Sequence, residues 1–128
     1  MTNFGSKESL SGIWFAIHNE AKYAIDYPSK LRYISFIKRL SDDFPCLNCK
    51  PHFQEYVKKH PFEDYWSRRK MLDGQMIEIG LFEWTVDFHN TVNKRLNKPI
   101  IDLLTAYRLF YKSEALCSAE CGEESVRK

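Results

Sequence analysis

Apolar residues recur at intervals of three and four along most of the chain, which places them on one face of successive helices. In the first such segment, Leu10, Trp14 and Ile17 form the apolar stripe. Prolines stand at or near the boundaries between segments, where helices tolerate them. The pattern predicts helices over about residues 7–25, 28–40, 46–60, 81–97 and 102–112. It therefore predicts an all-α fold, a four-helix bundle with a short fifth helix.

Two segments depart from the helical pattern. Around residues 66–80, Asp73-Gly74 lies between short apolar stretches, which is typical of a two-residue hairpin turn and predicts a small hairpin-like insertion. After Leu116 large apolar residues become scarce, so residues 113–128 are predicted to form a mobile C-terminal tail. The expected organisation is one domain over residues 1–112, followed by this tail.

The composition is that of a single globular domain. Of 128 residues, 44% are hydrophobic and 28% are charged, and the 19 basic and 17 acidic side chains leave a net charge of only +2. This imbalance is too weak to favour nucleic acid or an anionic membrane as a partner. No apolar run approaches the roughly 20 residues of a membrane span, and the first residues lack the layout of a secretory signal. We therefore expect a cytoplasmic protein that is not secreted.

The four cysteines form two close pairs, Cys46-x-x-Cys49 and Cys117-x-x-x-Cys121. Cys46 follows a proline at the expected start of a helix, so both sulfurs of the first pair lie on one face and can form a disulfide. Unpaired N–H groups and the positive end of the helix dipole favour a thiolate there, and the thiolate is the attacking species in disulfide exchange. The first pair therefore favours redox chemistry.

Zinc binding is the principal alternative for these cysteines. A zinc-stabilised helical interaction module could use Cys46, Cys49 and His52 with one distant ligand, but the second cysteine pair lies far beyond the usual spacing of zinc sites. A plain helical adaptor with an incidental disulfide is a third interpretation. The sequence favours the redox interpretation, which requires no metal ligand.

A second group of polar residues follows the predicted helix over residues 81–97. His89, Asn93 and Leu96 share one face, with Asn90 alongside, and Lys94, Arg95 and Lys98 add positive charge at the end. Amides, a ring and cations on one strip suit the ring edges and pyrophosphate of a dinucleotide. Because there is no glycine-rich phosphate loop, such a cofactor would be held between helices. Trp14 and His18, four residues apart on the first helix, form a matching aromatic pair.

These motifs, in this order, resemble the Erv/ALR family of FAD-linked sulfhydryl oxidases. The resemblance covers about residues 10–111 and is greatest to the small single-domain viral members. It is carried by Trp14-x-x-x-His18, Tyr27-Pro28, Phe44-Pro45-Cys46-x-x-Cys49, His52-Phe53 and Trp84-x-x-x-x-His89-Asn90-x-Val92-Asn93-x-x-Leu96-x-Lys98-Pro99.

The resemblance implies an oxidase that passes electrons from dithiols to FAD and then to O2, giving a disulfide and H2O2. Cys49 would lie nearer the flavin, and Cys46 would exchange with the incoming dithiol. The implied cofactor contacts, including two aromatic residues of the last helix, are Trp14, His18, Cys49, His89, Asn90, Val92, Asn93, Leu96, Lys98, Tyr107 and Tyr111.

The resemblance also implies partners. They are thiol-containing protein substrates, with a thioredoxin-like carrier as one candidate, O2, and a second copy of the chain paired through the first two helices. Cys117 and Cys121 are similar in kind to a shuttle disulfide, with free tail thiols as the equal alternative. Host cytoplasm or virion would be the location if the viral resemblance holds. Val86 and Leu103 stand where many members carry a structural disulfide, so apolar packing is expected to replace that crosslink.

Overall fold

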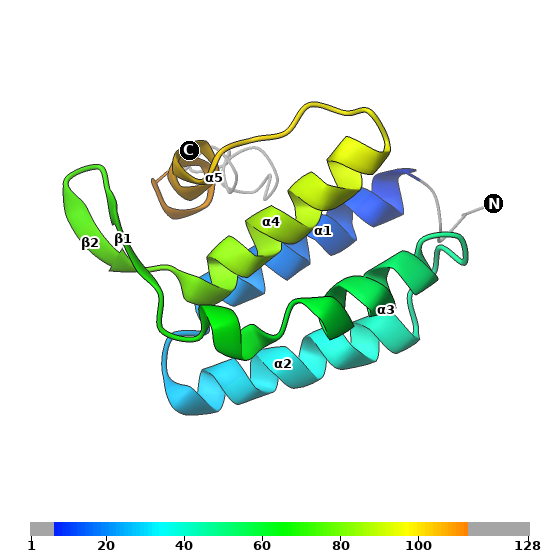
Figure 1. Ribbon diagram of the computed structural model, residues 1–128, viewed down its shortest axis with the longest axis horizontal. Coiled ribbons are helices and arrows are strands. Elements are labelled where there is room, and N and C mark those ends of the chain that lie inside the picture. Colours follow the sequence, from blue (N-terminus) through cyan, green and yellow to red (C-terminus); the bar gives the residue numbers. More distant parts are fainter. Residues whose placement is uncertain (1–6, 113–128) are drawn as a thin grey trace, which may run out of the picture.

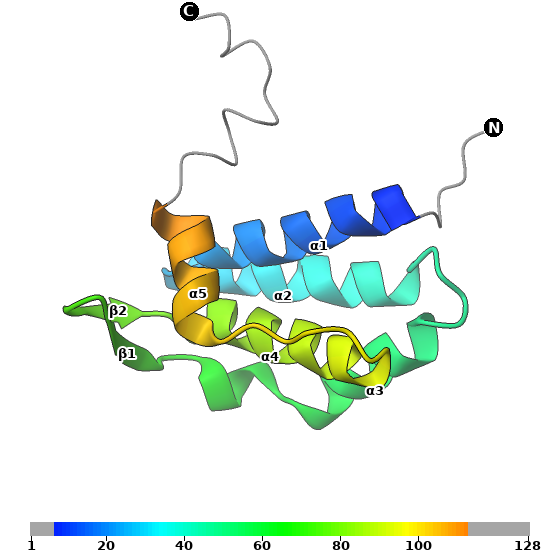
Figure 2. The same cartoon turned by 90° about the horizontal axis from the view of Figure 1, so that it is seen from above.

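The computed structural model describes residues 7–112 of the chain, with side chains from residue 11 onward. Four helices pack side by side as a bundle, and a short fifth helix crosses one end (Figures 1 and 2). This arrangement confirms the predicted all-α fold. The tail from residue 113, with Cys117 and Cys121, lies outside the described residues. The bundle helices are α1 (Lys7–Lys22), α2 (Tyr27–Asp42), α3 (Lys50–Lys59) and α4 (Gly80–Arg95).

Helix α4 forms the centre of the core. All residues from 80 to 86 are buried, as expected for a helix start that is covered on every side. Trp84 is fully buried, and its indole N–H donates to the carbonyl of His60. Gly80 lies so close to the 3₁₀ turn η1 (Phe62–Tyr65) that a Cβ would overlap the carbonyl oxygen of Tyr65. A glycine is therefore required at this contact.

Helix α3 begins later than the sequence pattern predicts. We expected a helix from Cys46, but Cys46–Cys49 form a turn and α3 starts at Lys50. Pro51 explains the difference, because proline lacks an N–H and fits only the first turn of a helix. Within the turn, the carbonyl of Cys46 accepts from the backbone N–H groups of Cys49 and Lys50.

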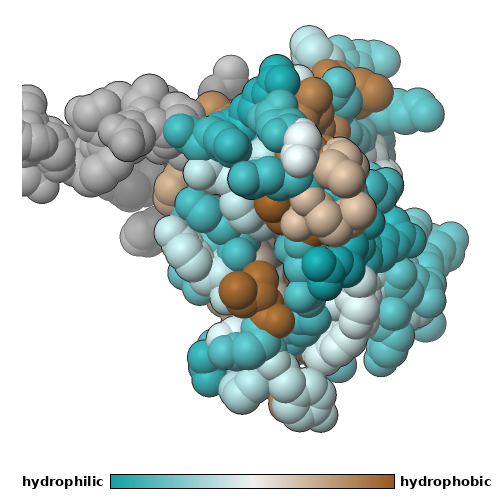
Figure 3. All heavy atoms as spheres, turned by 90° about the vertical axis from the view of Figure 1, so that its left-hand side faces the viewer, coloured by the Kyte–Doolittle hydropathy of each residue, from teal (hydrophilic) through white to brown (hydrophobic). Residues whose placement is uncertain are grey.

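The predicted hairpin is present. Strands β1 (Arg69–Leu72) and β2 (Gln75–Glu78) pair antiparallel, with Leu72 opposite Gln75. Asp73 and Gly74 have positive φ of 52° and 79°, which is the conformation that Asp-Gly favours in a two-residue hairpin turn. The molecular face at this end is mostly hydrophilic, with separate apolar areas (Figure 3).

A lysine of α2 secures the base of the hairpin. Lys30 is buried, and its Nζ lies 2.7 Å from a carboxylate oxygen of Glu78 and 2.7 Å from the carbonyl oxygen of Trp66. Glu78 is more accessible, with 36% of its side chain exposed against 7% for Lys30. The hairpin is therefore fixed to the bundle by a cation that has few other partners.

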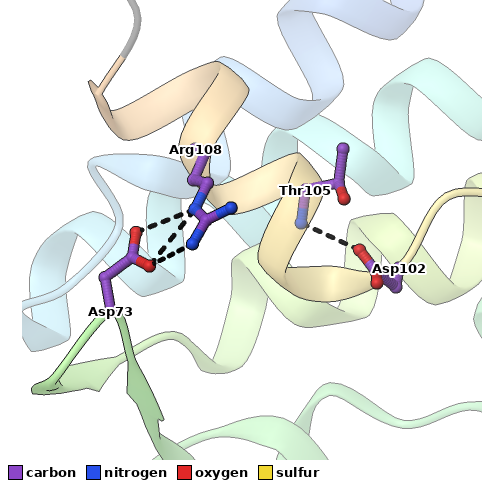
Figure 4. A network of polar contacts seen from close by, with 4 residues as sticks. All are labelled: Asp73, Asp102, Thr105 and Arg108. Carbon is purple, nitrogen blue, oxygen red and sulfur yellow. Dashed lines mark hydrogen bonds and ion pairs between the residues drawn. The ribbon is translucent and has the colours of Figure 1, made fainter.

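The last helix is held at both ends (Figure 4). The Asp102 carboxylate accepts from the backbone N–H of Thr105 and caps α5 (Leu103–Tyr107). The chain then continues as a π-helical turn, η2 (Arg108–Lys112). Arg108 in that turn donates to both carboxylate oxygens of Asp73 at the hairpin tip, the shortest distance being 2.6 Å. The insertion thus extends from the base of α4 to the last helix.

Candidate functional site

A pocket of about 660 Å³ lies among the helices. This volume is within the range of small-molecule and cofactor sites, roughly 300–1,000 Å³. Its walls are mostly apolar and aromatic, and they come from α1, the turn before α3, α4, the loop that follows α4, and α5 with η2. The lining residues discussed below are Trp14, His18, Cys49, His52, Phe53, Val86, Phe88, His89, Val92, Asn93, Arg95, Leu96, Lys98 and Phe110.

A disulfide joins Cys46 and Cys49 at one wall of this pocket, with a Cα–Cα distance of 5.2 Å. Cys49 lines the pocket and Cys46 does not. Cys49 is also the residue before α3, so its sulfur, rather than that of Cys46, lies at the positive end of the helix dipole. Because α3 starts late, its N-terminus stabilises a thiolate at Cys49 rather than at Cys46.

Trp14 and His89 form a flat stack within the pocket. Their ring centroids are 3.8 Å apart and their planes differ by 3°. Trp14 also lies against the ring of Phe88 at 5.0 Å. These rings connect α1 to α4 and give the pocket a planar wall suited to a flat ring system.

His18 and His89 are joined by a hydrogen bond between His18 Nε2 and His89 Nδ1 at 2.8 Å. The other nitrogen of His18 lies 2.8 Å from the hydroxyl of Thr85. Burial, and then the charge of His89, lower the pKa of His18 to about 3. Burial, and then the charge of Lys98, lower the pKa of His89 to about 4. Both rings are therefore neutral at neutral pH.

The pocket also carries polar and cationic groups. Asn93, Arg95 and Lys98 line it from the end of α4 and the loop beyond. Lys98 is held in place by its backbone N–H, which donates to the carbonyl of Asn93 at 2.7 Å. Cations beside an aromatic wall meet the requirements of a pyrophosphate joined to flat rings.

Three residues of the expected cofactor set lie outside the pocket lining. The amide of Asn90 accepts from the N–H of Ile101 at 3.0 Å and donates to its carbonyl at 2.7 Å, so it holds the loop after α4 in place. Tyr107 is buried and packs against Tyr111 at 4.8 Å, and the ring of Tyr111 contacts Phe82. These residues lie behind the pocket wall.

Several lining residues were not among the expected contacts, including His52, Phe53, Arg95 and Phe110. His52 and Phe53 lie on the first turn of α3, beside Cys49, and follow from the disulfide's position once that turn is known. Arg95 belongs to the cationic end that the sequence already indicated. Phe110 packs at 5.1 Å from the ring of His18, a contact between distant segments that no local pattern indicates.

FAD fits the residues that are present. Cys49 of the disulfide lines the same pocket as the aromatic rings, where a redox-active ring system is needed, and Asn93, Arg95 and Lys98 line that pocket too and can bind a diphosphate. Among residues 11–112, no three His, Cys, Asp or Glu side chains gather as a metal site. Within the same described part, no helix has the length and apolarity to cross a membrane. The fold and the site are thus those of a helical flavoprotein.

The family is established by comparison. The chain belongs to the Erv1/Alr family, whose model matches residues 11–112. An African swine fever virus protein named FAD-linked sulfhydryl oxidase is 33% identical over 113 residues, covering 86% of this chain and 85% of its own. The protein of a second isolate of that virus is 32% identical over the same shares. The FAD-linked sulfhydryl oxidase ERV1 of Oryza sativa subsp. japonica is 29% identical over 93 residues, covering 68% of this chain and 41% of its own.

Proposed function

We propose that the chain uses its Cys46–Cys49 disulfide to oxidise pairs of thiols in substrate proteins, with Cys46 as the sulfur that is attacked. The chain is an FAD-dependent thiol oxidase, in agreement with its family and with the names of its relatives. The observation that carries the assignment of roles is that Cys49 lines the aromatic pocket while bonded to Cys46, which does not.

The exchange proceeds in two displacements. A substrate thiolate attacks the sulfur of Cys46, forming a mixed disulfide and releasing Cys49 as a thiolate. The second substrate thiolate then attacks the substrate sulfur of this mixed disulfide, and the sulfur of Cys46 leaves. The substrate gains one disulfide, and the two cysteines together gain two electrons and two protons. Cys49 is the better leaving group because the N-terminus of α3 stabilises its negative charge.

The other pocket residues hold the cofactor. When bound, FAD would supply the two-electron acceptor for the reduced cysteine pair, with O2 as the final acceptor and H2O2 as the product. Trp14 and His89 provide the planar wall, and His18 supports His89 through their hydrogen bond. Asn93, Arg95 and Lys98 bind the polar end, while Val92 and Leu96 exclude water along the side. Asn90, Tyr107 and Tyr111 act indirectly, by supporting the loop and the last helix.

The chain acts as a homodimer in this proposal. A shallow apolar hollow lies on the outer side of α1 and α2, lined in part by Gly12, Ile13, Ala16, Phe36 and Leu40. Burial of such a surface against a second copy favours association. Sedimentation of the purified protein measures its mass directly, and a monomer at micromolar concentration would contradict this part of the proposal.

The catalytic domain ends at about residue 112, and the tail beyond it relays electrons through Cys117 and Cys121. The support is the close spacing of this second cysteine pair in the sequence. Cys117→Ser and Cys121→Ser should slow the oxidation of protein substrates, a thioredoxin-like carrier among them, but spare small dithiols. Unchanged rates with both substrate types would end the shuttle proposal.

The cytoplasm is the proposed location, which rests on the likeness to viral proteins.

The assignment of roles is tested with single cysteine variants. The purified protein should be yellow, consume O2 when a small dithiol is added, and produce H2O2. Cys49→Ser should abolish turnover and retain FAD, because the cysteine is reactive and its neighbours hold the cofactor. Loss of FAD from Cys49→Ser would contradict the division of roles.

Cys46→Ser completes the comparison. In this variant Cys49 remains as a free thiol in the pocket, while in Cys49→Ser the free thiol of Cys46 lies outside the pocket lining. With Cys117 and Cys121 also replaced by serine in both variants, a thiol-specific reagent too large for the pocket should therefore label Cys49→Ser faster than FAD-loaded Cys46→Ser. The opposite order would place Cys49 on the outside and overturn the proposed roles.

A further inference from the structure

A hydrogen-bonded series of three side chains, Thr85, His18 and His89, runs from the core to the pocket. Thr85 is fully buried on α4, and its hydroxyl oxygen lies 2.6 Å from the carbonyl oxygen of Phe82 and 2.8 Å from His18 Nδ1. His18 Nε2 then lies 2.8 Å from His89 Nδ1. His89 lines the pocket, so this series ends at the cofactor site.

The hydrogen bonds of this series can be donated in only one consistent direction. A carbonyl oxygen carries no hydrogen, so the short contact to Phe82 is a hydrogen bond only if the Thr85 hydroxyl donates to it. The hydroxyl has one hydrogen, so Thr85 must accept from His18, which therefore carries its proton on Nδ1. His18 Nε2 is then bare, and His89 must donate to it from Nδ1.

We propose that Thr85 is a positioning residue that fixes the tautomers of His18 and His89, so that His89 presents a bare, hydrogen-bond-accepting Nε2 to the pocket. Both rings are neutral at neutral pH, which leaves one proton on each. Within the described residues, no group forms a hydrogen bond with His89 Nε2, so that nitrogen is available to a ligand.

This polarity selects the kind of group that binds there. A bare ring nitrogen accepts from a hydroxyl or an amino group and gives no hydrogen bond to a phosphate oxygen. His89 therefore binds a donor group of the cofactor, and the phosphates are left to Arg95 and Lys98. This inference rests on the proposed function only in taking FAD as the ligand.

The tautomers are measured directly by ¹⁵N NMR of the histidine rings in the FAD-loaded, untagged protein. The chain has only four histidines, and a protonated ring nitrogen is readily distinguished from a bare one. The expected result is a protonated Nδ1 and a bare Nε2 on both His18 and His89. A protonated Nε2 on either ring would overturn the proposal, whether or not the protein oxidises thiols.

Two variants separate tautomer control from packing. Thr85→Val keeps the shape but removes the hydroxyl, so both rings should reverse, with His89 now protonated on Nε2. Thr85→Ser keeps the hydroxyl and should leave both tautomers unchanged. Unchanged tautomers in Thr85→Val would overturn the proposal.

The affinity for FAD provides a second measurement. Reversal removes one hydrogen bond to the cofactor, so the FAD dissociation constant of Thr85→Val should rise about threefold to tenfold, equivalent to ~0.7–1.4 kcal/mol. Thr85→Ser should bind FAD as the parent protein does. An equal loss in both variants would assign Thr85 a packing role and refute the inference, and this result is independent of turnover.

Discussion

The ion pair at the base of the hairpin yields a prediction that runs against a simple count of contacts. Glu78→Gln keeps the shape of the side chain and weakens one interaction of Lys30. Lys30→Met removes the charge and both hydrogen bonds of the lysine, to Glu78 and to the carbonyl of Trp66. We nevertheless expect Glu78→Gln to reduce the free energy of unfolding more.

The difference follows from which partner is buried. With 7% of its side chain exposed, Lys30 cannot regain water when Glu78 loses its charge, whereas Glu78, at 36%, can turn to solvent when Lys30 is gone. Two charges 2.7 Å apart attract by about 6 kcal/mol at an effective dielectric constant of about 20. After desolvation, hydrogen bonds to charged groups contribute roughly 1.5–3 kcal/mol, so Glu78→Gln should cost about 2 kcal/mol.

Lys30→Met should cost about 1 kcal/mol, chiefly for the carbonyl that loses its donor, because the methionine side chain suits a buried position. The double variant should resemble Lys30→Met alone. Urea unfolding followed by circular dichroism, with equal excess FAD throughout, gives the free energies. For Glu78→Gln the midpoint of thermal unfolding should fall by roughly 6–10 °C.

Glu55→Gln is the matched control. Glu55 pairs with Lys59 on the surface of α3, where both side chains are more than half exposed. The same substitution should produce no measurable change there, because the surface pair is solvated in both variants. The reasoning is refuted if Lys30→Met destabilises more than Glu78→Gln, or if Glu55→Gln costs as much as either.

Two further predictions concern the core and the pocket. Gly80→Ala should destabilise severely in thermal unfolding, because the added Cβ would overlap the carbonyl oxygen of Tyr65; an unchanged midpoint would contradict this reasoning. The pKa of His18 is lowered to about 3 and that of His89 to about 4, so the unfolded chain binds more protons as the pH falls below about 6.5. The free energy of unfolding should therefore decrease from pH 6.5 toward pH 4, and His89→Gln should make this decrease shallower; an equal slope in that variant would contradict the cause.

The sequence was sufficient for the features that depend on local rules. Helical spacing gave the bundle, and Asp73-Gly74 gave the hairpin, because a two-residue turn needs residues that adopt positive φ. The start of α3 was misplaced because the cysteine spacing alone also fits a helix. Pro51 contained the information, since it belongs in a first turn.

The parts that escaped prediction depend on contacts between distant segments. No local pattern links Thr85 to His18, 67 residues away, and so the direction of their hydrogen bond cannot be read from either helix. Asn90 has the residue type of a ligand contact, yet its amide holds the backbone of Ile101. Side chains of one type can bind a cofactor or support the chain, and only the packed structure distinguishes the two.

The assembly of the pocket from both ends of the domain has a consequence for the life of the protein in the cell. A chain made while riboflavin is scarce has an empty cofactor pocket between its helices, and it opens to proteases more often. Cofactor at a hundred times its dissociation constant adds about 2.7 kcal/mol, which reduces the open population about a hundredfold. Vitamin supply should therefore regulate how much of this protein accumulates, without any change in its synthesis.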